Sequence, residues 1–249
     1  MRSSNLWNGV VGFWSATAGP SGYRLLDRSG RGNHGTLTNM DAATDWVVDG
    51  GRYALDFDGT NDYVLIQKSQ SFDALIGDKT IQAWIKTSGA GASFRTVFSR
   101  DKTFSITLNN NVFGTFNWVA SQFASSGVNV ANSLWNHLVV QIRAGVSNGS
   151  QCFVNGLPRG SAFTYNTQVG NTTNDLTIGS ALDGANSIVN EYVAGRFDDL
   201  ILWARTLSSS EILQLYQIGR GGMLTPRRRR RAYSVATGLR RRLLLTGQV

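Results

Sequence analysis

The chain is dominated by short segments in which apolar and polar residues alternate, and Gly, Asn and Asp residues separate these segments. Alternation with a period of two places apolar side chains on one face of a β-strand and polar side chains on the other. In residues 80–86, for example, Ile81, Ala83 and Ile85 share one face. Comparable segments lie at 54–58, 63–66, 104–108, 112–116, 137–142, 151–154 and 175–179. Many short strands with regular turns predict an antiparallel β-sandwich or barrel.

Local signals predict several turns and one helix. Residues 59–62 separate two alternating segments as a hairpin-like turn, and three asparagines at 109–111 separate another two. Asn155 and Gly156 form a dipeptide that suits a two-residue type I′ hairpin. Residues 208–211 read Ser-Ser-Ser-Glu, a capping box, and apolar residues follow at helical spacing. We therefore expect one short helix at about residues 208–217.

The composition agrees with a β-rich domain that folds without covalent cross-links. Glu191 and Glu211 are the only glutamates and there are four lysines, whereas helical bundles are usually rich in both. The single cysteine, Cys152, excludes an internal disulfide, and its alternating segment predicts a small buried side chain. No apolar stretch approaches the ~18 residues that span a bilayer. The N-terminal residues lack the pattern of a signal peptide, which predicts synthesis in a cytoplasm without export.

The net charge of +8 is concentrated in the last 25 residues. Residues 225–249 contain eight arginines and no acidic residue, so residues 1–224 hold 16 basic and 16 acidic residues. We place a domain boundary at this change, with a folded domain at 1–222 and an arginine-rich tail at 223–249. The neutral domain gives no sign of the clustered basic surface that is typical of nucleic-acid-binding domains.

Three roles are considered for the tail. A solvated, disordered segment is the default for a run of like charges, and a nucleic-acid-binding arm would exploit attraction to phosphates. The third role is a docking peptide, in which arginines pair with acidic surface on a partner and a short stretch adds a strand to it. We favour docking, and the residues expected to anchor the tail are Arg227, Arg228, Arg229, Arg230, Arg231, Tyr233, Arg240, Arg241 and Arg242.

Eight short motifs follow one another along residues 5–218, and they include DRSGRGNHGTL at 27–37 and GRFDDLILW at 195–203. The others lie at 10–14, 54–64, 80–85, 135–138, 153–156 and 178–179. Together they resemble the laminin-G-like, concanavalin A-like lectin/glucanase superfamily. The resemblance implies an all-β, concanavalin A-like jelly-roll sandwich of two antiparallel sheets, and the sequence adds one short C-terminal helix and an Arg-rich tail. The basic extension after such a domain also resembles those of tailed-bacteriophage virion proteins.

The resemblance raises the question of glycoside hydrolysis, and the residues argue against it. Glucanases of the superfamily resemble one another in a strand that carries two glutamates near an aspartate, and this motif is absent here. Successive strand residues such as Asp198 and Asp199 point to opposite faces, so they do not act jointly on one bond. His34 and His137 have no accompanying serine or cysteine motif, so we expect structural roles for both. We therefore predict that the chain is not an enzyme.

No cofactor is required by the sequence, but a structural calcium ion is a candidate. Many relatives in the superfamily hold calcium near the first long loop and the final strand, and calcium prefers carboxylate and carbonyl oxygens. The matching positions here are Asp27, Asn33, Asp198 and Asp199, with Asp58 and Asp62 as a second cluster. Asp and Asn are also ordinary turn formers, and Asp198 would then cap the glycine-rich loop by accepting its N–H groups. We favour this turn-forming alternative.

The sequence leaves the carbohydrate-binding residues unknown. An exposed aromatic platform would mark a glycan site, and the candidates are Trp118, Phe123 and Tyr165. Aromatic side chains mostly fill sandwich cores, however, so each is more simply explained by packing.

The observations together predict a non-enzymatic, lectin-like structural or attachment protein of a virion surface, of the capsid-decoration or fibre type. Its tail would bind a capsid or another virion protein, and it would reach the virion after synthesis in the host cytoplasm. The alternatives are a carbohydrate-binding module or glycan-degrading enzyme of the superfamily and, third, a protein that binds nucleic acid through the tail. Cell-surface glycans and further copies of the chain are additional candidate partners, nucleic acid is less favoured, and no membrane span is expected.

Overall fold

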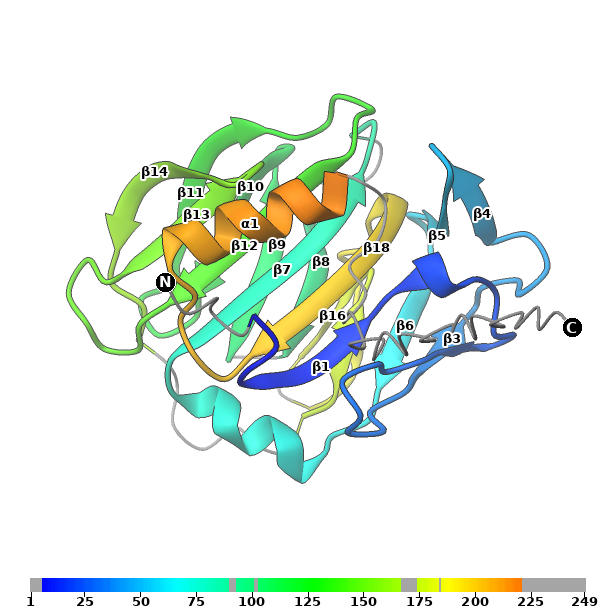
Figure 1. Ribbon diagram of the computed structural model, residues 1–249, viewed down its shortest axis with the longest axis horizontal. Helices are drawn as coiled ribbons and strands as arrows, with labels where there is room; N and C mark the ends of the chain where they lie inside the picture. Colours follow the sequence, from blue (N-terminus) through cyan, green and yellow to red (C-terminus); the bar gives the residue numbers. More distant parts are fainter. Residues whose placement is uncertain (1–5, 90–92, 101–102, 167–173, 184, 221–249) are drawn as a thin grey trace, which may run out of the picture.

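Two antiparallel β-sheets packed face to face make up most of the protein (Figure 1). The computed structural model describes residues 6–89, 93–100, 103–166, 174–183 and 185–220. Within these residues the only α-helix is α1 (Ser209–Arg220), and it lies outside the sandwich. The predicted jelly-roll sandwich with one short C-terminal helix is therefore confirmed.

The first sheet is built around the last strand of the chain. Its strands are β1 (Val10–Trp14), β4 (Trp46–Asp49), β5 (Arg52–Asp58), β7 (Lys79–Lys86), β12 (Asn136–Ile142), β13 (Ser150–Val154), β14 (Leu157–Phe163) and β18 (Ala194–Trp203). They follow the order β14-β13-β12-β7-β18-β5-β4, and β1 also pairs with β18. The central strand β18 thus pairs with β1, β5 and β7, which come from three distant parts of the sequence.

The second sheet also has eight strands and packs against the first. Its strands are β2 (Arg24–Leu25), β3 (Gly35–Thr38), β6 (Tyr63–Ile66), β8 (Phe94–Arg100), β9 (Phe104–Asn109), β10 (Val112–Asn117), β11 (Gln122–Asn129) and β15 (Leu176–Ile178). Their order is β11-β10-β9-β8-β15-β6-β3-β2. A separate small hairpin of β16 (Ala181–Leu182) and β17 (Ile188–Val189) follows β15. The 3₁₀-helices η1 (Ala16–Ala18) and η2 (Gln70–Ile76) were not predicted.

The predicted turns are confirmed where both strands belong to one sheet, and the prediction is wrong where the chain crosses between sheets. The β9–β10 hairpin is confirmed, and Asn110 and Asn111 take positive φ angles in its turn. The β13–β14 hairpin is also confirmed, because Asn155 and Gly156 both have positive φ, as type I′ requires. The hairpin-like turn at 59–62 is wrong as a hairpin, since β5 and β6 belong to different sheets and the chain crosses between layers there.

The main core fills the space between the sheets. Ile81, Ala83 and Ile85 of β7 all point into it, as the alternation predicts. At its centre the Trp14 ring lies 6.0 Å from the Phe98 ring. Cys152 is also buried here, and burial raises the pKa of its thiol to about 12, so the side chain behaves as a small apolar residue. The expectation for Cys152 is confirmed.

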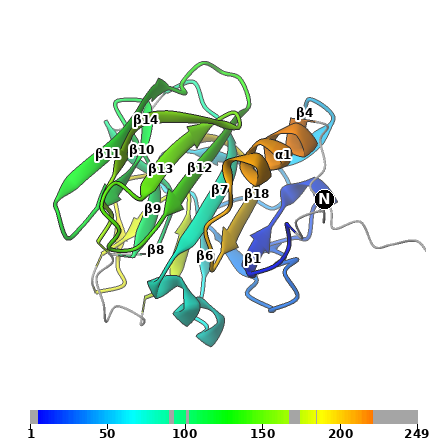
Figure 2. The ribbon, with the colours of Figure 1, turned by 60° about the vertical axis from the view of Figure 1, so that its left-hand side comes forward.

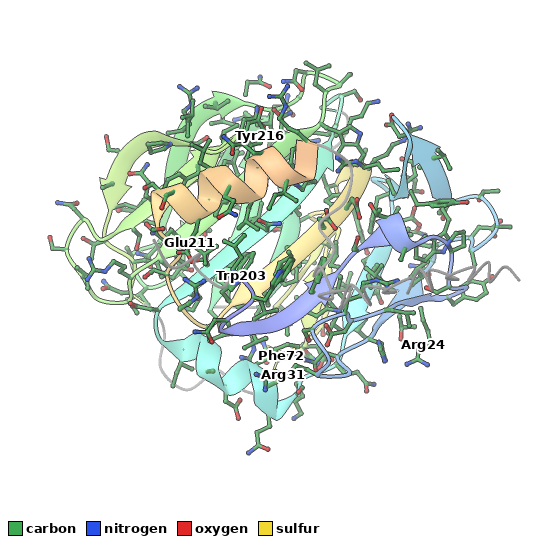
Figure 3. All side chains as sticks on the ribbon, viewed as in Figure 1. Arg24, Arg31, Phe72, Trp203, Glu211 and Tyr216 are labelled. Atoms are coloured by element: carbon green, nitrogen blue, oxygen red, sulfur yellow. The ribbon has the colours of Figure 1, made fainter. Side chains whose placement is uncertain are left out.

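A second apolar cluster lies on the outer face of the first sheet, beneath α1 (Figure 2). Ile212 and Leu215 of the helix pack there against Val139, Phe153 and Trp203. Figure 3 shows Glu211 and Tyr216 on the helix above Trp203. This cover explains why β7 is buried on both faces although its sequence alternates. The described helices include none long and apolar enough to cross a membrane.

Both ends of α1 are fixed by specific contacts. At its start the Ser208 N–H donates to Glu211 Oε2 at 2.8 Å and the Glu211 N–H donates to Ser208 Oγ at 3.3 Å, which confirms the predicted capping box. At its end the Arg52 guanidinium donates to the carbonyl of Gly219 and lies 5.1 Å from the Trp84 ring centroid. The described part of the helix runs to Arg220, three residues beyond the predicted end.

Candidate functional site

Four aromatic side chains gather on the outer face of the second sheet, and we call them the aromatic cluster: Phe94, Phe116, Trp118 and Phe123. The Phe94 ring lies 5.9 Å from that of Phe116 and 6.1 Å from that of Phe123, both edge-on. The Trp118 ring lies 5.5 Å from that of Phe116. All four residues are half-buried, so each keeps part of its ring at the surface.

Strand register explains why these side chains meet. Phe113 of β10 points into the core, so Phe116, three residues later, points outward. Phe116 pairs directly with Phe123 on β11, which places Phe123 on the same face. Gly114 leaves room for that ring, because a Cβ there would lie 2.5 Å from Phe123 Cζ. Thus a glycine on one strand lets the aromatic ring of the next strand lie over it.

A cleft with a volume of about 500 Å³ adjoins the cluster where β11 and β14 approach each other. Phe123 and Phe163 contribute to its wall, so Phe123 belongs to both the cluster and the cleft. The rest of the wall is mainly amide and hydroxyl side chains: Asn117, Gln122, Ser125, Asn148, Ser161, Thr164 and Asn166. Aromatic rings beside uncharged hydrogen-bonding groups offer a sugar both a flat apolar surface and polar partners.

The aromatic candidates from the sequence separate clearly. Trp118 and Phe123 are brought together in the cluster. Tyr165 is buried in the core, and its single hydroxyl proton can be donated to the carbonyl of Phe116 at 3.1 Å or of Thr103 at 3.3 Å, so it is not an exposed platform. Burial raises the pKa of Tyr165. Phe94 and Phe116 were missed as site residues, although the alternation of β10 places Phe116 opposite Phe113 and could have identified it.

Small hydroxyl side chains form the middle of the same face. Thr96, Ser99, Ser105 and Thr107 are buried, and Thr107 Oγ1 donates to Ser105 Oγ at 2.9 Å. The segment after β17 crosses this face, where the carbonyl of Glu191 accepts the Thr96 N–H at 2.9 Å. The Glu191 carboxyl accepts a second hydrogen bond from the Thr96 hydroxyl. Burial raises the pKa of Glu191 despite this bond.

The two glutamates lie on opposite sides of the sandwich. Glu191 contacts the outer face of the second sheet, whereas Glu211 belongs to α1 on the outer face of the first. Glu211 is paired with Arg205, whose Nη2 lies 2.8 Å from Oε1. Hydrogen bonding to Arg205 lowers the pKa of Glu211. Because both sheets stand between them, these carboxyls do not act together on one glycosidic bond.

The candidate calcium ligands Asp27 and Asn33 do meet, in the glycine-rich loop before β3. Asp27 Oδ1 accepts the N–H groups of Phe13 and Ser29, and Oδ2 accepts the Ser29 hydroxyl at 2.8 Å and the Asn33 N–H at 2.9 Å. The Asn33 amide donates to the Val11 carbonyl and to Ser71 Oγ. Both Asp27 oxygens are thus engaged by donors, which suits a carboxylate that organises a loop.

Asp198 and Asp199 do not complete this set. Asp198 Oδ1 accepts the Ser15 hydroxyl and the N–H groups of Ala16 and Thr17, so it caps η1. The alternative that Asp198 caps the glycine-rich loop is therefore wrong, since Asp27 does so. Burial raises the pKa of Asp198, although Arg52 Nη1 lies 3.7 Å from Oδ2.

The β18 strand departs from simple alternation at this point. Its register shifts between Asp198 and Ile201, and Asp199 has a φ of +46°. Because of this irregularity, the expected placement on opposite faces of a regular strand does not describe the two aspartates, and both are buried. Asp58 and Asp62 likewise bond within their own turn, where Asp62 Oδ2 accepts the Asp58 N–H.

The described residues therefore contain no group of three or more His, Cys, Asp or Glu side chains placed to hold a metal ion. As arranged, the proposed ligands fit hydrogen-bonded caps and not a calcium ligand set. Calcium binding itself stays a prediction. The tail anchors between Arg227 and Arg242 lie outside the described residues, so the docking prediction is also untested.

Solved structures with the same fold include several binding domains. The binding domain of Paraclostridial Mosquitocidal Protein 1 has a TM-score of 0.61 at 15% identity, covering 86% of this chain and 53% of that domain. Domain 4 of an extracellular arabinanase from Geobacillus stearothermophilus, solved with arabinotriose, has a TM-score of 0.62 at 15% identity. That match covers 84% of this chain and 98% of that domain. Trypanosoma rangeli sialidase in complex with sialic acid matches at 0.61 and 16% identity, covering 85% of this chain and 33% of the sialidase.

At these identities the matches show a shared fold alone, and the chain spans about half of the mosquitocidal binding domain. No curated protein matches the sequence. The sequence profile of the concanavalin A-like lectin/glucanases superfamily matches residues 58–213, which is more than half of the chain. The profile begins in the last residue of β5 and ends within α1, so it includes most strands of both sheets. The chain therefore belongs to the concanavalin A-like lectin/glucanases superfamily.

Proposed function

We propose that the protein is a non-enzymatic glycan-binding module whose site is formed by the aromatic cluster and the adjoining cleft. The observation that carries the proposal is the position of Phe123, which joins half-exposed rings to a cleft of about 500 Å³ lined by amides and hydroxyls. The arabinanase domain with the same fold was solved with arabinotriose, which supports a sugar as ligand. The separation of Glu191 from Glu211 by the sandwich supports binding without hydrolysis.

Binding of labelled neutral arabino-, xylo- and gluco-oligosaccharides by the full chain tests this proposal. Phe123→Ala should weaken binding of the preferred sugar by about tenfold or more, because aromatic anchors dominate such sites. Tyr53→Ala is the matched control, since Tyr53 is exposed on the first sheet, and it should leave affinity unchanged. Equal losses in the two variants, or no binding of any sugar, would contradict the proposal. Release of reducing sugar that disappears in Glu191→Gln would instead make the protein an enzyme.

The wider role that we propose is attachment at a virion surface, with the sandwich outward and the tail bound to a capsid or other virion protein. The division of charge supports it, because a neutral domain is followed by eight arginines without an acid. Arginine forks pair well with carboxylates on a repeating protein surface. A chain ending at Gly222 should remain folded and soluble but no longer join its particle. Incorporation of that shortened chain at normal copy number would place the anchor in the sandwich.

The nucleic-acid alternative has its own measurement. Steeply salt-dependent DNA binding by the full chain, lost in the chain that ends at Gly222, would favour a nucleic-acid-binding tail over protein docking.

A further inference from the structure

A second cavity, with a volume of about 480 Å³, lies at the opposite end of the second sheet from the aromatic cluster. It forms where β3 begins and β6 ends, because these strands are antiparallel and Gly35 pairs with Ile66. Residues 32–34 precede β3 and residues 67–69 follow β6, and together they make most of its wall. Arg24 and Thr36, which pair across β2 and β3, complete it. We call this cavity the cationic pocket.

Three basic side chains line the cationic pocket: Arg24, His34 and Lys68. Arg24 and Lys68 are exposed, and Figure 3 shows Arg24 extending from the edge of the sheet. The ion pairs between described residues include none of the three. Among the described residues in the wall, none is acidic and none is Phe, Tyr or Trp. The pocket therefore offers positive charge and hydrogen-bond donors without a built-in counter-ion.

The wall behind these groups is held in place by hydrogen bonds that are buried or partly buried. The Asp27 N–H donates to His34 Nδ1 at 3.0 Å, so the proton of the neutral ring lies on Nε2, which acts as a donor. The carbonyl of the neighbouring Asn33 accepts the Trp14 indole N–H at 2.7 Å. The Asn33 side chain is fixed in turn by Val11 and Ser71. The loop is thus ordered before any ligand arrives, which reduces the entropy cost of binding.

Two carboxylates lie close to the pocket, and both are engaged elsewhere. Asp27 stands behind the wall and accepts four hydrogen bonds from the loop. Asp175 accepts the backbone N–H of Lys68 at 2.7 Å and the side-chain amide of Asn186 at 3.0 Å. Neither lines the cavity. They reduce the local positive potential without occupying the place of an anionic ligand.

We propose that the cationic pocket binds the anionic group, a carboxylate or a sulfate, of an acidic glycan. This inference rests on the proposed glycan-binding function and extends it to a second contact on the same sheet. A volume of about 480 Å³ suits one charged sugar unit and its neighbour better than an extended strand. Single-stranded nucleic acids usually need aromatic side chains for stacking, and the described wall has no such ring apart from His34. An acidic glycan is therefore the favoured ligand.

The test compares labelled oligosaccharides of equal length by fluorescence polarisation: a sulfated one, a polygalacturonate and a neutral arabino-oligosaccharide. The full chain is used at about 0.15 M salt, where long-range attraction is screened. The variant is Arg24→Gln with Lys68→Gln, and the control is Arg143→Gln with Arg159→Gln, which are exposed residues outside both cavities. Both variants keep the tail and carry the same net charge. Since all four side chains are exposed, both should melt like the wild type.

We expect the pocket variant to bind the preferred acidic sugar about tenfold more weakly, since two charge-assisted contacts are lost, while the control changes by less than about twofold. The neutral sugar should bind both variants equally. The stronger of the two acidic probes identifies sulfate or carboxylate as the recognised group.

Equal weakening in pocket and control variants would overturn the proposal, because binding would then follow overall charge and the tail. Tight binding of a labelled deoxythymidine strand with the same dependence on Arg24 and Lys68 would also overturn it in favour of nucleic acid. Failure of the proposed aromatic glycan site gives a different result: the neutral sugar does not bind, or its binding does not depend on Phe123. A selective effect of the pocket variant would then still support an anion site.

Discussion

Replacing Asp27 by Asn separates a loop-capping carboxylate from a calcium ligand. The Asn side chain keeps one carbonyl oxygen and replaces the other by an NH₂ donor. The Oδ1 side faces two backbone N–H groups, so the amide is expected to turn its oxygen there. Its NH₂ then faces the Ser29 hydroxyl, which can rotate to accept, and the Asn33 N–H, which cannot. One buried backbone donor is left without a partner.

The cost follows from these contacts. An unsatisfied buried donor costs ~1 to 3 kcal/mol, and the remaining bonds weaken because bonds to a charged acceptor exceed neutral ones by ~1 kcal/mol. Part of the loop is exposed, so we expect a total loss of about 3 kcal/mol in the free energy of unfolding. For a domain of this size each kcal/mol lowers the melting midpoint by ~2 to 4 °C. Asp27→Asn should therefore melt about 10 °C below the wild type.

Thermal melting of both proteins, with and without a chelator, is the assay. Asp41→Asn is the control, because Asp41 accepts the N–H of Ala43 in an exposed turn and its loss should cost less than about 0.5 kcal/mol. We expect the chelator to leave every midpoint unchanged. An Asp27→Asn midpoint equal to that of Asp41→Asn would refute the capping argument. A chelator effect seen in the wild type and absent from Asp27→Asn would show that calcium uses this carboxylate.

Three further variants probe the helix contact and the two glutamates. Glu211→Gln should lower the free energy of unfolding by about 1 kcal/mol at neutral pH. The pKa of Glu211 is lowered from 4.5, so the difference in melting midpoint from the wild type should close as the pH falls below that value. A difference that stays constant with pH would disprove the charge effect. Burial raises the pKa of Glu191, so the wild type loses stability as the pH rises through that pKa and the carboxyl ionises. Glu191→Gln should therefore melt at or above the wild-type midpoint at pH 7 and below it at pH 4. Gly219→Ala would place a Cβ 2.6 Å from Trp84 Nε1. Chemical denaturation should therefore show a loss of ~1 to 3 kcal/mol in the free energy of unfolding, whereas Gly→Ala in a helix usually stabilises. A gain in stability would show that α1 does not pack this closely.

Local signals in the sequence predicted the elements that local interactions determine. The capping box at Ser208 and the turn at Asn155 and Gly156 both depend on residues within four positions of each other, and both are confirmed. The exchange between sheets after β5 depends on tertiary packing, and the same turn residues suit a hairpin and a crossing equally well. Asp198 was a plausible ligand from its type, but its hydrogen-bond partners lie more than 180 residues away at Ser15 to Thr17. Partners so far apart in the sequence produce no local sequence pattern from which the contact could be predicted.

The aromatic cluster illustrates the same division. Trp118 and Phe123 were named from residue type, whereas Phe94 joins them only because β8, β9 and β10 lie next to one another in the sheet. Tyr165 has the same chemistry and a polar flank in sequence, yet it is buried. Alternation gives the face of a strand but not whether another segment covers it. The sequence therefore predicted that an exposed platform would be aromatic, but it could not identify all the residues that form it.

The position of β18 has a consequence for how the protein is made. This strand is the last of the sandwich to leave the ribosome, yet it separates β5 from β7 and also binds β1. Until it is available, the earlier strands of the first sheet have unpaired edges, which are prone to associate with other chains. Pairing across such long sequence separations is also slow. The sandwich is thus expected to close after synthesis has passed residue 203, and chains interrupted before that point should aggregate or be degraded instead of forming a smaller stable domain.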